Sequence, residues 1–456
     1  MQKQNILLWQ FFEVNQKKVI NKLKRKNRKI YCPNFFDKSH NNLIFGLADF
    51  NYLLKNFNQQ SFFNTDFFIN FYKENFLIWL KSFFSRGHYR EQNFFDLDAI
   101  FKCQSCYVYN YIKKKKITHL ITGPHFSWNG FDYLAVSMAK QLNVKTIFLL
   151  AVFRNRFFYT LDYKDWGFFK KAKNLFKPLD KKNLQTLKIN KLHYMDQNFY
   201  LTQKFAFKIL IPNIFKIFSK NGIRFFFNKF INFKKNLNLY KFWVQENHRN
   251  FVTKKLPRRY IYFPLHLQPE STTIGHNATE YIDQALCIEK IHEKLPLNFK
   301  IVIKEHPAQE DLYHRGKLFY KRISYLKNVI FTNVADSSME LIKKSSIVAT
   351  VTGTVGWEAI RLLKPVITFG NAYYNFLPGV FFWNNSINIK KISKTKVDEK
   401  ILLDKIHTLS KKMGFGLDSV DYSSAEDLTS DFKNMGYNES REMNILINSL
   451  EAILKK

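Results

Sequence analysis

The second half of the chain alternates short apolar runs with segments of helical spacing. The apolar runs are rich in β-branched and aromatic residues, as buried strands are, and include YIYFPL (260–265), FKIVIK (299–304) and SIVATV (346–351). Between them, residues 281–295 and 336–345 space apolar side chains three and four positions apart, which is typical of amphipathic helices. Strands that alternate with helices of this length predict a doubly wound parallel sheet.

A second α/β unit is predicted upstream. ITHLIT (117–122) has the pattern of a buried strand, GPHFSWNG (123–130) that of a polar loop, and a helix and another strand follow up to residue 153. Strand, loop, helix and strand in this order form the βαβ unit of a parallel sheet. Two such domains in one chain enclose a cleft. We therefore expect the GT-B class: α/β, with two Rossmann-like doubly wound domains facing that cleft.

The chain is also too long for a single ordinary core, since it has 456 residues. We expect residues 1–258 to form an N-terminal, acceptor-side domain with helical and basic additions. Residues 259–400 are expected to form the domain that binds a nucleotide-sugar. Residues 401–456 are expected to be a helical tail that packs back on the N-terminal domain.

Three polar clusters of the second domain each follow a predicted strand. They are HLQPESTTIGH (266–276), KEHP (304–307) and TGTVGWE (352–358). In open parallel sheets, ligands bind beyond the carboxyl ends of the strands. The three clusters therefore predict one binding site.

The TGTVGWE cluster has the form of a turn from a strand into a helix. The small residues Gly353 and Gly356 allow close approach of a phosphate, and the helix N-terminus offers free N–H groups. The hydroxyls of Thr352 and Thr354 can add hydrogen bonds, and Glu358 is placed to accept bonds from ribose. A plain glycine-containing turn is the alternative, because the full GxGxxG pattern and the P-loop are both absent.

The KEHP cluster contributes a histidine that the following proline holds at a strand end. His306 can donate to a phosphate and stabilise the charge on a leaving nucleotide. Lys304 and, further along, Arg315 are candidates to bind the same anion. A surface histidine in a turn is the alternative, and the neighbouring TGTVGWE cluster favours the binding role.

A general base is required if a sugar is transferred with inversion, because the acceptor hydroxyl must lose its proton. Glu270 is the first candidate, and Gln268 in the same segment is a candidate for nucleotide binding. Asp132 and His125 of the N-terminal domain are rivals for the role of base. A helix cap at Asp132 and a turn at Glu270 remain open as structural roles.

The chain is strongly basic, with a net charge of +36, and the charge is uneven: residues 201–260 hold fourteen Lys and Arg against one Glu. Such a surface favours anionic partners, and contact with the inner face of the cytoplasmic membrane is one expectation. A solvated Lys-rich surface and ordinary core packing of an amphipathic helix are the alternatives. The run at 22–29 is expected to be solvated or to face lipid. No module that reads nucleic acid is recognised, so no nucleic-acid partner is expected.

Compartment and metal chemistry are constrained by the cysteines and by the apolar segments. Cys103 and Cys106 form a lone CxxC without a second ligand pair, so we expect no metal site. Few cysteines in a long chain fit a reducing, cytoplasmic setting. The sequence offers no signal peptide and no apolar segment long enough for a spanning helix.

These residues resemble the capsule polysaccharide biosynthesis proteins, a family that includes bacterial β-Kdo transferases. The likeness covers about 120 residues and is carried by YIYFPLHLQPESTT, VIKEHP, TVTGTVGWEAIRLLKPVITFG and NAYYNFLPGV. It implies a GT-B enzyme that transfers a CMP-activated acidic sugar with inversion, without a required metal or cofactor. By that likeness His306 binds the CMP phosphate, Thr352 and Thr354 assist, and Glu270 falls near the catalytic acid. The HP and Ser/Thr elements are also similar to bacterial sialyltransferases.

The sequence therefore predicts a glycosyltransferase of capsule or surface polysaccharide synthesis. The expected donor carries Kdo or a related acidic sugar on CMP, and the acceptor is a glycan or a lipid-linked oligosaccharide. A CDP-polyol phosphotransferase of the teichoic-acid type is the alternative within enzymes. A polyanion- or nucleic-acid-binding protein is the alternative outside them, but it explains none of the three clusters.

Overall fold

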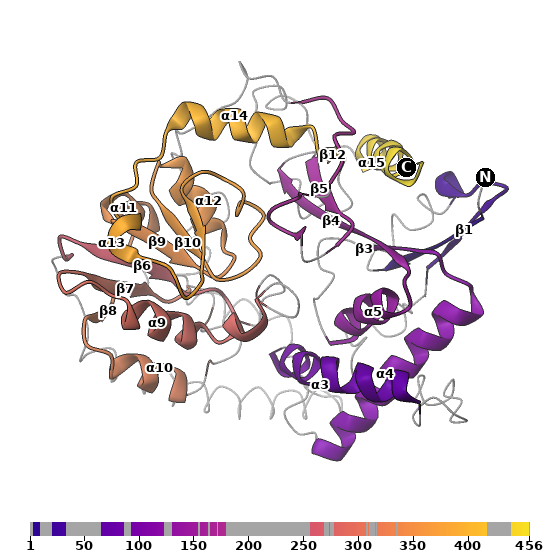
Figure 1. Cartoon of the computed structure of the whole chain (residues 1–456), viewed down its shortest axis with the longest axis horizontal. Helices are drawn as coiled ribbons and strands as arrows, with labels where there is room; N and C mark the ends of the chain where they lie inside the picture. The colour runs from indigo at the N-terminus through magenta and orange to yellow at the C-terminus, as the bar shows by residue number, and fades with distance from the viewer. Residues whose placement is uncertain are drawn as a thin grey trace, which may run out of the picture.

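The computed structural model contains two six-stranded sheets with helices packed against them (Figure 1). The structure describes the following residues: 3–9, 21–32, 65–85, 93–122, 130–153, 156–162, 165–170, 172–178, 256–268, 273, 278–306, 309, 315, 317–333, 336–416 and 439–455.

The first sheet has the strand order β12-β5-β4-β3-β1-β2. Its strands are β1 (Gln4–Trp9), β2 (Arg28–Tyr31), β3 (His119–Thr122), β4 (Lys145–Phe153), β5 (Arg156–Thr160) and β12 (Met413–Phe415). Strands β1 to β4 are parallel to one another, whereas β5 is antiparallel to β4 and β12 is antiparallel to β5. The helices that follow in this part of the chain are α3 (Asp66–Ser85), α4 (Phe94–Lys114) and α5 (Gly130–Gln141).

The second sheet is wholly parallel, with the order β11-β10-β9-β6-β7-β8. Its strands are β6 (Tyr260–Pro264), β7 (Lys300–Lys304), β8 (Val329–Phe331), β9 (Ile347–Thr350), β10 (Val366–Thr368) and β11 (Val380–Phe382). The chain runs outward from β6 to β8 and then returns to the other side of β6 at β9. The strand order therefore reverses between β6 and β9, which is where open α/β sheets bind ligands.

The helices of this second unit follow one another between and after its strands. They are η8 (Thr279–Ile282), α9 (Gln284–Glu293), α10 (Lys317–Ser324), α11 (Ser338–Lys344), α12 (Thr354–Arg361), α13 (Ile389–Ile392) and α14 (Glu399–Ser410). The Asp283 side chain accepts the N–H of Ala285 at the start of α9, and Ser337 accepts that of Glu340 in α11. The helices predicted at 281–295 and 336–345 are thus present, and the prediction of two Rossmann-like α/β units is confirmed.

The central strands of the second sheet are buried on both faces, as their continuous apolar sequences predict. Tyr260 and Tyr262 belong to one apolar cluster, while Ile261 and Phe263 belong to another on the opposite face. The first of these clusters also contains Ile6, Leu8 and other buried residues of the first sheet. Apolar packing is therefore continuous between the two sheets on that side.

A close backbone contact joins the two units beside this shared cluster. Gly167 has a φ of +83°, and a Cβ atom added there would lie 2.2 Å from the carbonyl oxygen of Ala372. Next to it, the ring of Phe158 packs against Tyr373 and Phe376 with centroids 6.3 and 6.2 Å apart. Only glycine fits both the backbone angle and the contact at position 167.

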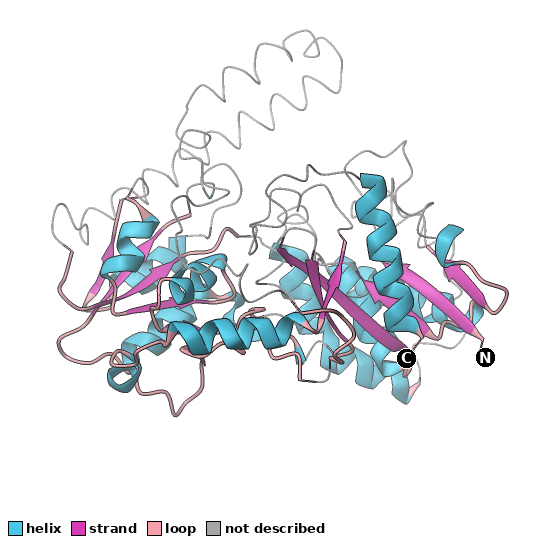
Figure 2. Cartoon of the chain, turned by 90° about the horizontal axis from the view of Figure 1, so that it is seen from above, coloured by secondary structure: helices cyan, strands magenta, loops and turns pink. Residues whose placement is uncertain are grey.

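The last described segments contact the first sheet. After α14, which crosses from one unit to the other in Figure 1, β12 pairs with β5, and α15 (Glu439–Leu454) contacts β12. Figure 2 shows α15 beside the strands of this sheet. Glu451 of α15 lies 2.7 Å from Arg28, so this arginine of the basic run at 22–29 makes an internal ion pair. The exact domain limits stay a prediction.

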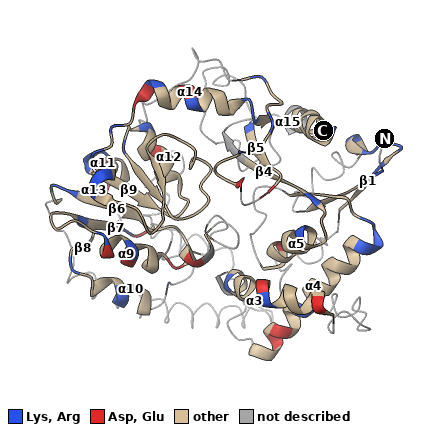
Figure 3. Ribbon diagram, viewed as in Figure 1, with Lys and Arg blue, Asp and Glu red and all other residues tan. Residues whose placement is uncertain are grey.

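Lys and Arg residues are distributed over the described elements of both units, with Asp and Glu residues among them on α4, α9 and α14 (Figure 3). The most basic stretch, 201–260, lies almost entirely outside the described residues. Among the helices that the structure describes, none is both long and apolar enough to cross a membrane.

Candidate functional site

The point where the strand order reverses is built around His266, which follows β6. Its Nε2 lies 2.8 Å from the Thr350 hydroxyl at the end of β9 and 3.3 Å from the N–H of Thr352. An N–H group can only donate, so Nε2 must be an acceptor and the ring proton resides on Nδ1. The Thr350 hydroxyl in turn accepts the N–H of Gly353 at 3.2 Å. The ends of β6 and β9 are thereby joined.

The glycines of the following turn fit this close packing. A Cβ at Gly353 would lie 2.9 Å from both His266 and the Thr350 hydroxyl, and one at Gly356 would lie 2.2 Å from the Tyr374 hydroxyl. That hydroxyl donates to the carbonyl oxygen of Gly353. These glycines therefore admit protein side chains on their Cβ side, which is a reason for glycine distinct from approach to a phosphate.

Helix α12 begins at this turn. Gly353 is its N-cap residue and supplies no side-chain cap, and Thr354 in the first turn is exposed. The N–H groups of Gly353 and Gly356 bond within the turn, so the exposed part of the helix start is at Thr354, near the positive end of the helix dipole. Thr352 is buried beside it. Thr352, Gly353 and Thr354, which the sequence predicts to bind a phosphate, thus lie together at the carboxyl end of β9.

The KEHP cluster contains a buried ion pair directly before His306. The Glu305 carboxylate accepts two bonds from Arg315, from Nε at 3.0 Å and from Nη2 at 2.9 Å. It also accepts the Tyr320 hydroxyl at 2.6 Å and the backbone N–H of His306 at 2.6 Å. The exposed fractions of the Arg315 and Glu305 side chains are 0% and 3%. The carboxylate is fully engaged and holds the His306 backbone.

Arg315 also contacts the segment after β6. Its Nη1 donates to the side-chain oxygen of Gln268 at 2.7 Å, and its Nη2 donates to the carbonyl oxygen of His266. The Gln268 amide donates to the carbonyl of Ile282 at 2.5 Å, and its backbone N–H and carbonyl both pair with Gln309 at 2.8 Å. The structure therefore places the two predicted nucleotide ligands Gln268 and Arg315 within a protein network. Their binding to nucleotide stays a prediction.

Lys304, the last residue of β7, is also buried at the carboxyl ends of the strands. Its Nζ donates to the carbonyl of Asp336 at 2.5 Å and to the Ser338 hydroxyl at 2.9 Å. Burial lowers the pKa of Lys304 to about 8, and the nearby Asp336 opposes that shift. The lysine is therefore held by α11 and its preceding turn, and it loses its charge more readily than an exposed lysine.

Glu358 lies one turn into α12 and is buried. Burial is the main cause that raises the pKa values of Tyr262 and Tyr374, and the charge of Glu358 adds to both shifts. Glu358 thus lies near two buried tyrosines beneath the turn. Its predicted contact with ribose stays a prediction.

The first sheet contributes Asp132, in the first turn of α5. Its carboxylate accepts the indole N–H of Trp9 at 2.9 Å, and its exposed fraction is 3%. Trp9 ends β1 and pairs in register with Thr122 at the end of β3. Asp132 therefore lies at the carboxyl ends of two parallel strands, and its role as a base stays a prediction. Glu270 and His125, the other candidates for the base, lie outside the described residues.

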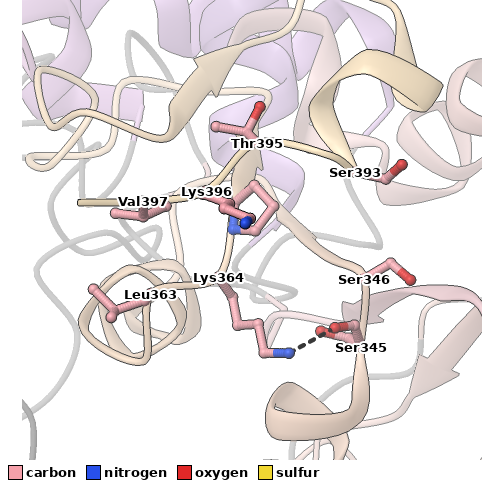
Figure 4. A pocket seen from close by; sticks show the side chains of 9 residues that line it. Ser345, Ser346, Leu363, Lys364, Ser393, Thr395, Lys396 and Val397 are labelled. Carbon is pink, nitrogen blue, oxygen red and sulfur yellow. Dashed lines mark hydrogen bonds between the residues drawn. The ribbon is translucent and has the colours of Figure 1, made fainter. Parts of the chain in front are cut away.

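A separate pocket of about 380 Å³ lies at the other end of the second sheet (Figure 4). Its lining includes Ser346, just before β9, and Pro365, just before β10. Lys364 spans part of it and donates to the carbonyl of Ser345 at 3.1 Å. The pocket thus belongs to the amino ends of the strands and is distinct from the site at His266.

Two central residues of the site, His266 and Glu305, were not singled out by the sequence motifs. Both stand inside segments that were, at the first position after a predicted strand. That position at a carboxyl strand end was the available signal. Among the described residues, no group of three His, Cys, Asp or Glu side chains could hold a metal ion. Cys103 and Cys106 lie buried on α4.

Comparison with solved structures returns matches of low sequence identity and low TM-score. The beta Kdo 2,7 transferase of Thermosulfurimonas dismutans KpsC is 14% identical, with a TM-score of 0.32, over 76% of this chain and 89% of that chain. The beta Kdo 2,4 transferase of the same KpsC is 12% identical, with a TM-score of 0.30, over 64% and 79%. The UDP-GlcNAc 2-epimerase of Methanocaldococcus jannaschii is 12% identical, with a TM-score of 0.27, over 90% and 98%.

At such identities and TM-scores these structures carry no conclusion about activity. No curated protein matches the chain. A family model does match: residues 228–413, which include all the described strands and loops of the second sheet and every contact around His266, fit the capsule polysaccharide biosynthesis protein family. The resemblance seen in the motifs is thereby confirmed over residues 228–413, which match this family's model.

Proposed function

We propose that the protein is a glycosyltransferase of capsule or surface polysaccharide synthesis, which binds its nucleotide-sugar donor at the carboxyl ends of β6, β7 and β9. One observation carries this proposal. The three strand-end clusters form a single hydrogen-bonded unit, in which His266 contacts the turn after β9 and Arg315 connects His266 to Glu305 and His306. The unit lies where the strand order reverses.

The donor phosphate is proposed to bind at the first turn of α12. Backbone N–H groups and the exposed Thr354 offer donors to phosphate oxygens there. His306, partly exposed and held through its backbone by Glu305, is proposed to stabilise the charge that develops on the leaving nucleotide. Thr352, Lys304 and Glu358 are proposed to contribute to the same nucleotide site.

The chemistry proposed is an inverting transfer. An acceptor hydroxyl oxygen attacks the anomeric carbon, the bond from that carbon to the phosphate oxygen breaks, and the nucleotide leaves with the electron pair. A carboxylate takes the proton of the attacking hydroxyl. Glu270 remains the first candidate for this base. Asp132 is buried and already bonded to Trp9, which favours a positioning role for it.

The donor proposed is CMP-Kdo or a related CMP-activated acidic sugar, used without a metal or cofactor. Support for it comes from the family of residues 228–413 and from the His-Pro cluster. The proposed acceptor is a glycan or a lipid-linked oligosaccharide. A net charge of +36 favours an anionic acceptor and contact with the anionic inner leaflet, so we propose a location on the cytoplasmic face of that membrane.

Donor screening tests this proposal. The purified protein is incubated with CMP-Kdo, other CMP-sugars, CDP-polyols and UDP-sugars, and both the nucleotide released and the mass of the product are read. Release of CMP with a glycosylated product supports the proposal. CMP release with transfer of a polyol phosphate identifies the teichoic-acid type of enzyme instead, and turnover of UDP-sugars alone refutes the CMP donor.

The role of His306 is tested in the same assay. His306→Ala removes the donor to the leaving phosphate, and kcat is expected to fall about 100- to 1,000-fold, as it does when one oxyanion donor is lost. His292→Ala is the matched control, because His292 is a partly exposed histidine of α9 that bonds the carbonyl of Lys327. Normal turnover by the folded His306→Ala variant would remove His306 from the mechanism.

A further inference from the structure

We propose that Arg315 is a positioning residue of the donor site: it fixes His306 relative to the turn before α12 without touching the donor itself. This inference rests on the proposed function for its catalytic consequence, and it differs from the expectation that Arg315 binds the nucleotide.

The Arg315 guanidinium uses most of its N–H groups to bond protein acceptors. Four of its five N–H groups have a partner: Nε–H and one Nη2–H bond Glu305, the other Nη2–H bonds the His266 carbonyl, and one Nη1–H bonds Gln268. The side chain has no exposed surface, and Phe319 lies 5.2 Å below the guanidinium. An arginine in this state is committed to holding its neighbours.

Those neighbours belong to two of the loops that form the donor site. On one side, the Glu305 carboxylate accepts the two parallel bonds from Arg315. It also accepts the N–H of His306 at 2.6 Å, so Arg315 restrains the His306 backbone through Glu305. On the other side, the carbonyl of His266 receives Nη2, while the ring of His266 accepts the N–H of Thr352 at 3.3 Å. The planar guanidinium of Arg315 therefore fixes the distance between His306 and the turn before α12.

The geometry requires a fork and a fixed charge. A lysine at position 315 would keep the positive charge but could not bond Glu305 through two parallel N–H groups while also reaching Gln268 and His266. The Glu305 carboxylate would then be left partly unpaired in a buried place. The spacing of the two loops should relax in such a variant even where the fold persists.

Helix α10 supplies a matched control. Arg322 also forms a fork with a carboxylate, with Nε 2.8 Å and Nη2 2.7 Å from Glu289, and it bonds Asp283 at 2.7 Å. Its side chain is 40% exposed, and its two carboxylate partners, Glu289 and Asp283, lie in α9 and at its N-cap. Both arginines thus make bidentate pairs in the same unit, and only Arg315 connects to His306.

The test compares Arg315→Lys, Tyr320→Phe and Arg322→Lys with the native chain in donor turnover. Arg315→Lys is expected to lower kcat about 100-fold, as a misplacement of about 1 Å does, with a smaller change in KM. Tyr320→Phe removes one bond to Glu305 and is expected to lower kcat several-fold. Arg322→Lys should retain native kcat and KM. Equal kinetics of the two arginine variants would overturn the inference.

Two further readouts separate positioning from loss of stability. Guanidinium ion added to Arg315→Ala should restore part of its turnover and none of that of His306→Ala. Ile288→Val, a core change in α9, should lower the melting temperature without lowering kcat at a temperature where all variants are folded. A core variant that loses as much kcat as Arg315→Lys would show that the arginine is merely structural.

The structural part of the inference can be tested without any donor. In protein labelled with ¹⁵N at histidine, the ring signals of His266 and His306 should shift in Arg315→Lys and Tyr320→Phe, and stay in place in Arg322→Lys. Absence of turnover in the native chain would refute the proposed function while leaving this outcome readable. Unmoved signals in all variants would overturn the positioning role.

Discussion

The carboxyl ends of the two sheets differ in how polar groups are organised. In the second sheet, the loops after β6, β7 and β9 are bonded to one another through His266, Arg315 and Glu305, all of them buried. In the described part of the first sheet, Asp132 bonds Trp9, and Trp9 packs edge-on against Phe131 at 5.4 Å. A charge network built before any ligand arrives is what electrostatic stabilisation of a leaving nucleotide requires.

This difference suggests a division of labour. Under the proposed function, the hydrogen-bonded loops of the second sheet would bind the phosphate of the donor. At its described carboxyl ends, the first sheet presents the buried carboxylate of Asp132 beside aromatic packing, and so offers less fixed electrostatic structure there. We therefore expect substitutions at the second sheet to have larger effects on the chemical step than substitutions at the first.

The largest expected effect separates the two sheets through the identity of the base. Glu270→Gln should lower kcat about 100- to 10,000-fold, because a positioned base contributes about that much. Asp132→Asn should lower kcat less than about tenfold, since the amide oxygen can still accept the bond from Trp9. Steady-state kinetics with saturating donor measure both. The reverse order of effects would transfer the role of base to Asp132 and remove the division proposed above.

A smaller effect is expected from packing beneath the phosphate turn. Gly356→Ala would place a Cβ 2.2 Å from the Tyr374 hydroxyl, so we expect the free energy of unfolding to fall by about 1–3 kcal/mol. Chemical denaturation measures this change. Thr354→Ala, at an exposed position two residues earlier, should change it by less than about 0.5 kcal/mol. An unchanged stability of Gly356→Ala would mean that Tyr374 does not pack against the turn.

A further effect concerns the pH dependence of stability. The pKa of Lys304 falls from 10.5 to about 8 on folding, so between these pH values the unfolded chain binds more protons. Stability should therefore rise with pH through this window, by at most about 3 kcal/mol, and the penalty should be fully present below pH 8. Unfolding free energies of the native chain and Lys304→Met, measured from pH 7 to 10, test it. A parallel pH dependence in both proteins would contradict the lowered pKa.

Much of the second sheet could be predicted because its sequence is locally consistent. Each buried strand is a continuous apolar run, and caps such as Asp283 and Ser337 mark helix starts. The pairing of β12 with β5 was not predicted, since it joins residues about 250 positions apart across an edge of the first sheet. Three residues, Met413–Phe415, are too few to give a strand pattern of their own.

The candidate site was predictable as a set of strand ends and not as a set of contacts. His306, Thr352 and Glu358 could be assigned to one edge because parallel strands end together. Arg315 was recognised as a nearby positive charge, but its burial depends on how a loop returns to Glu305 and on the fit of Gln268. Such contacts depend on side-chain geometry that composition and spacing do not encode.

The most direct measurement is a titration of the protein with CMP, CDP and UDP, followed by hydrogen exchange of the complex. We predict that CMP binds and that amide protection increases at residues 352–356, around the start of α12, and at Glu305 and His306. Protection should change least at the amino ends of β9 and β10, where the separate pocket lies. Failure of all three nucleotides to bind, or protection confined to that pocket or to the first sheet, would contradict the central claim.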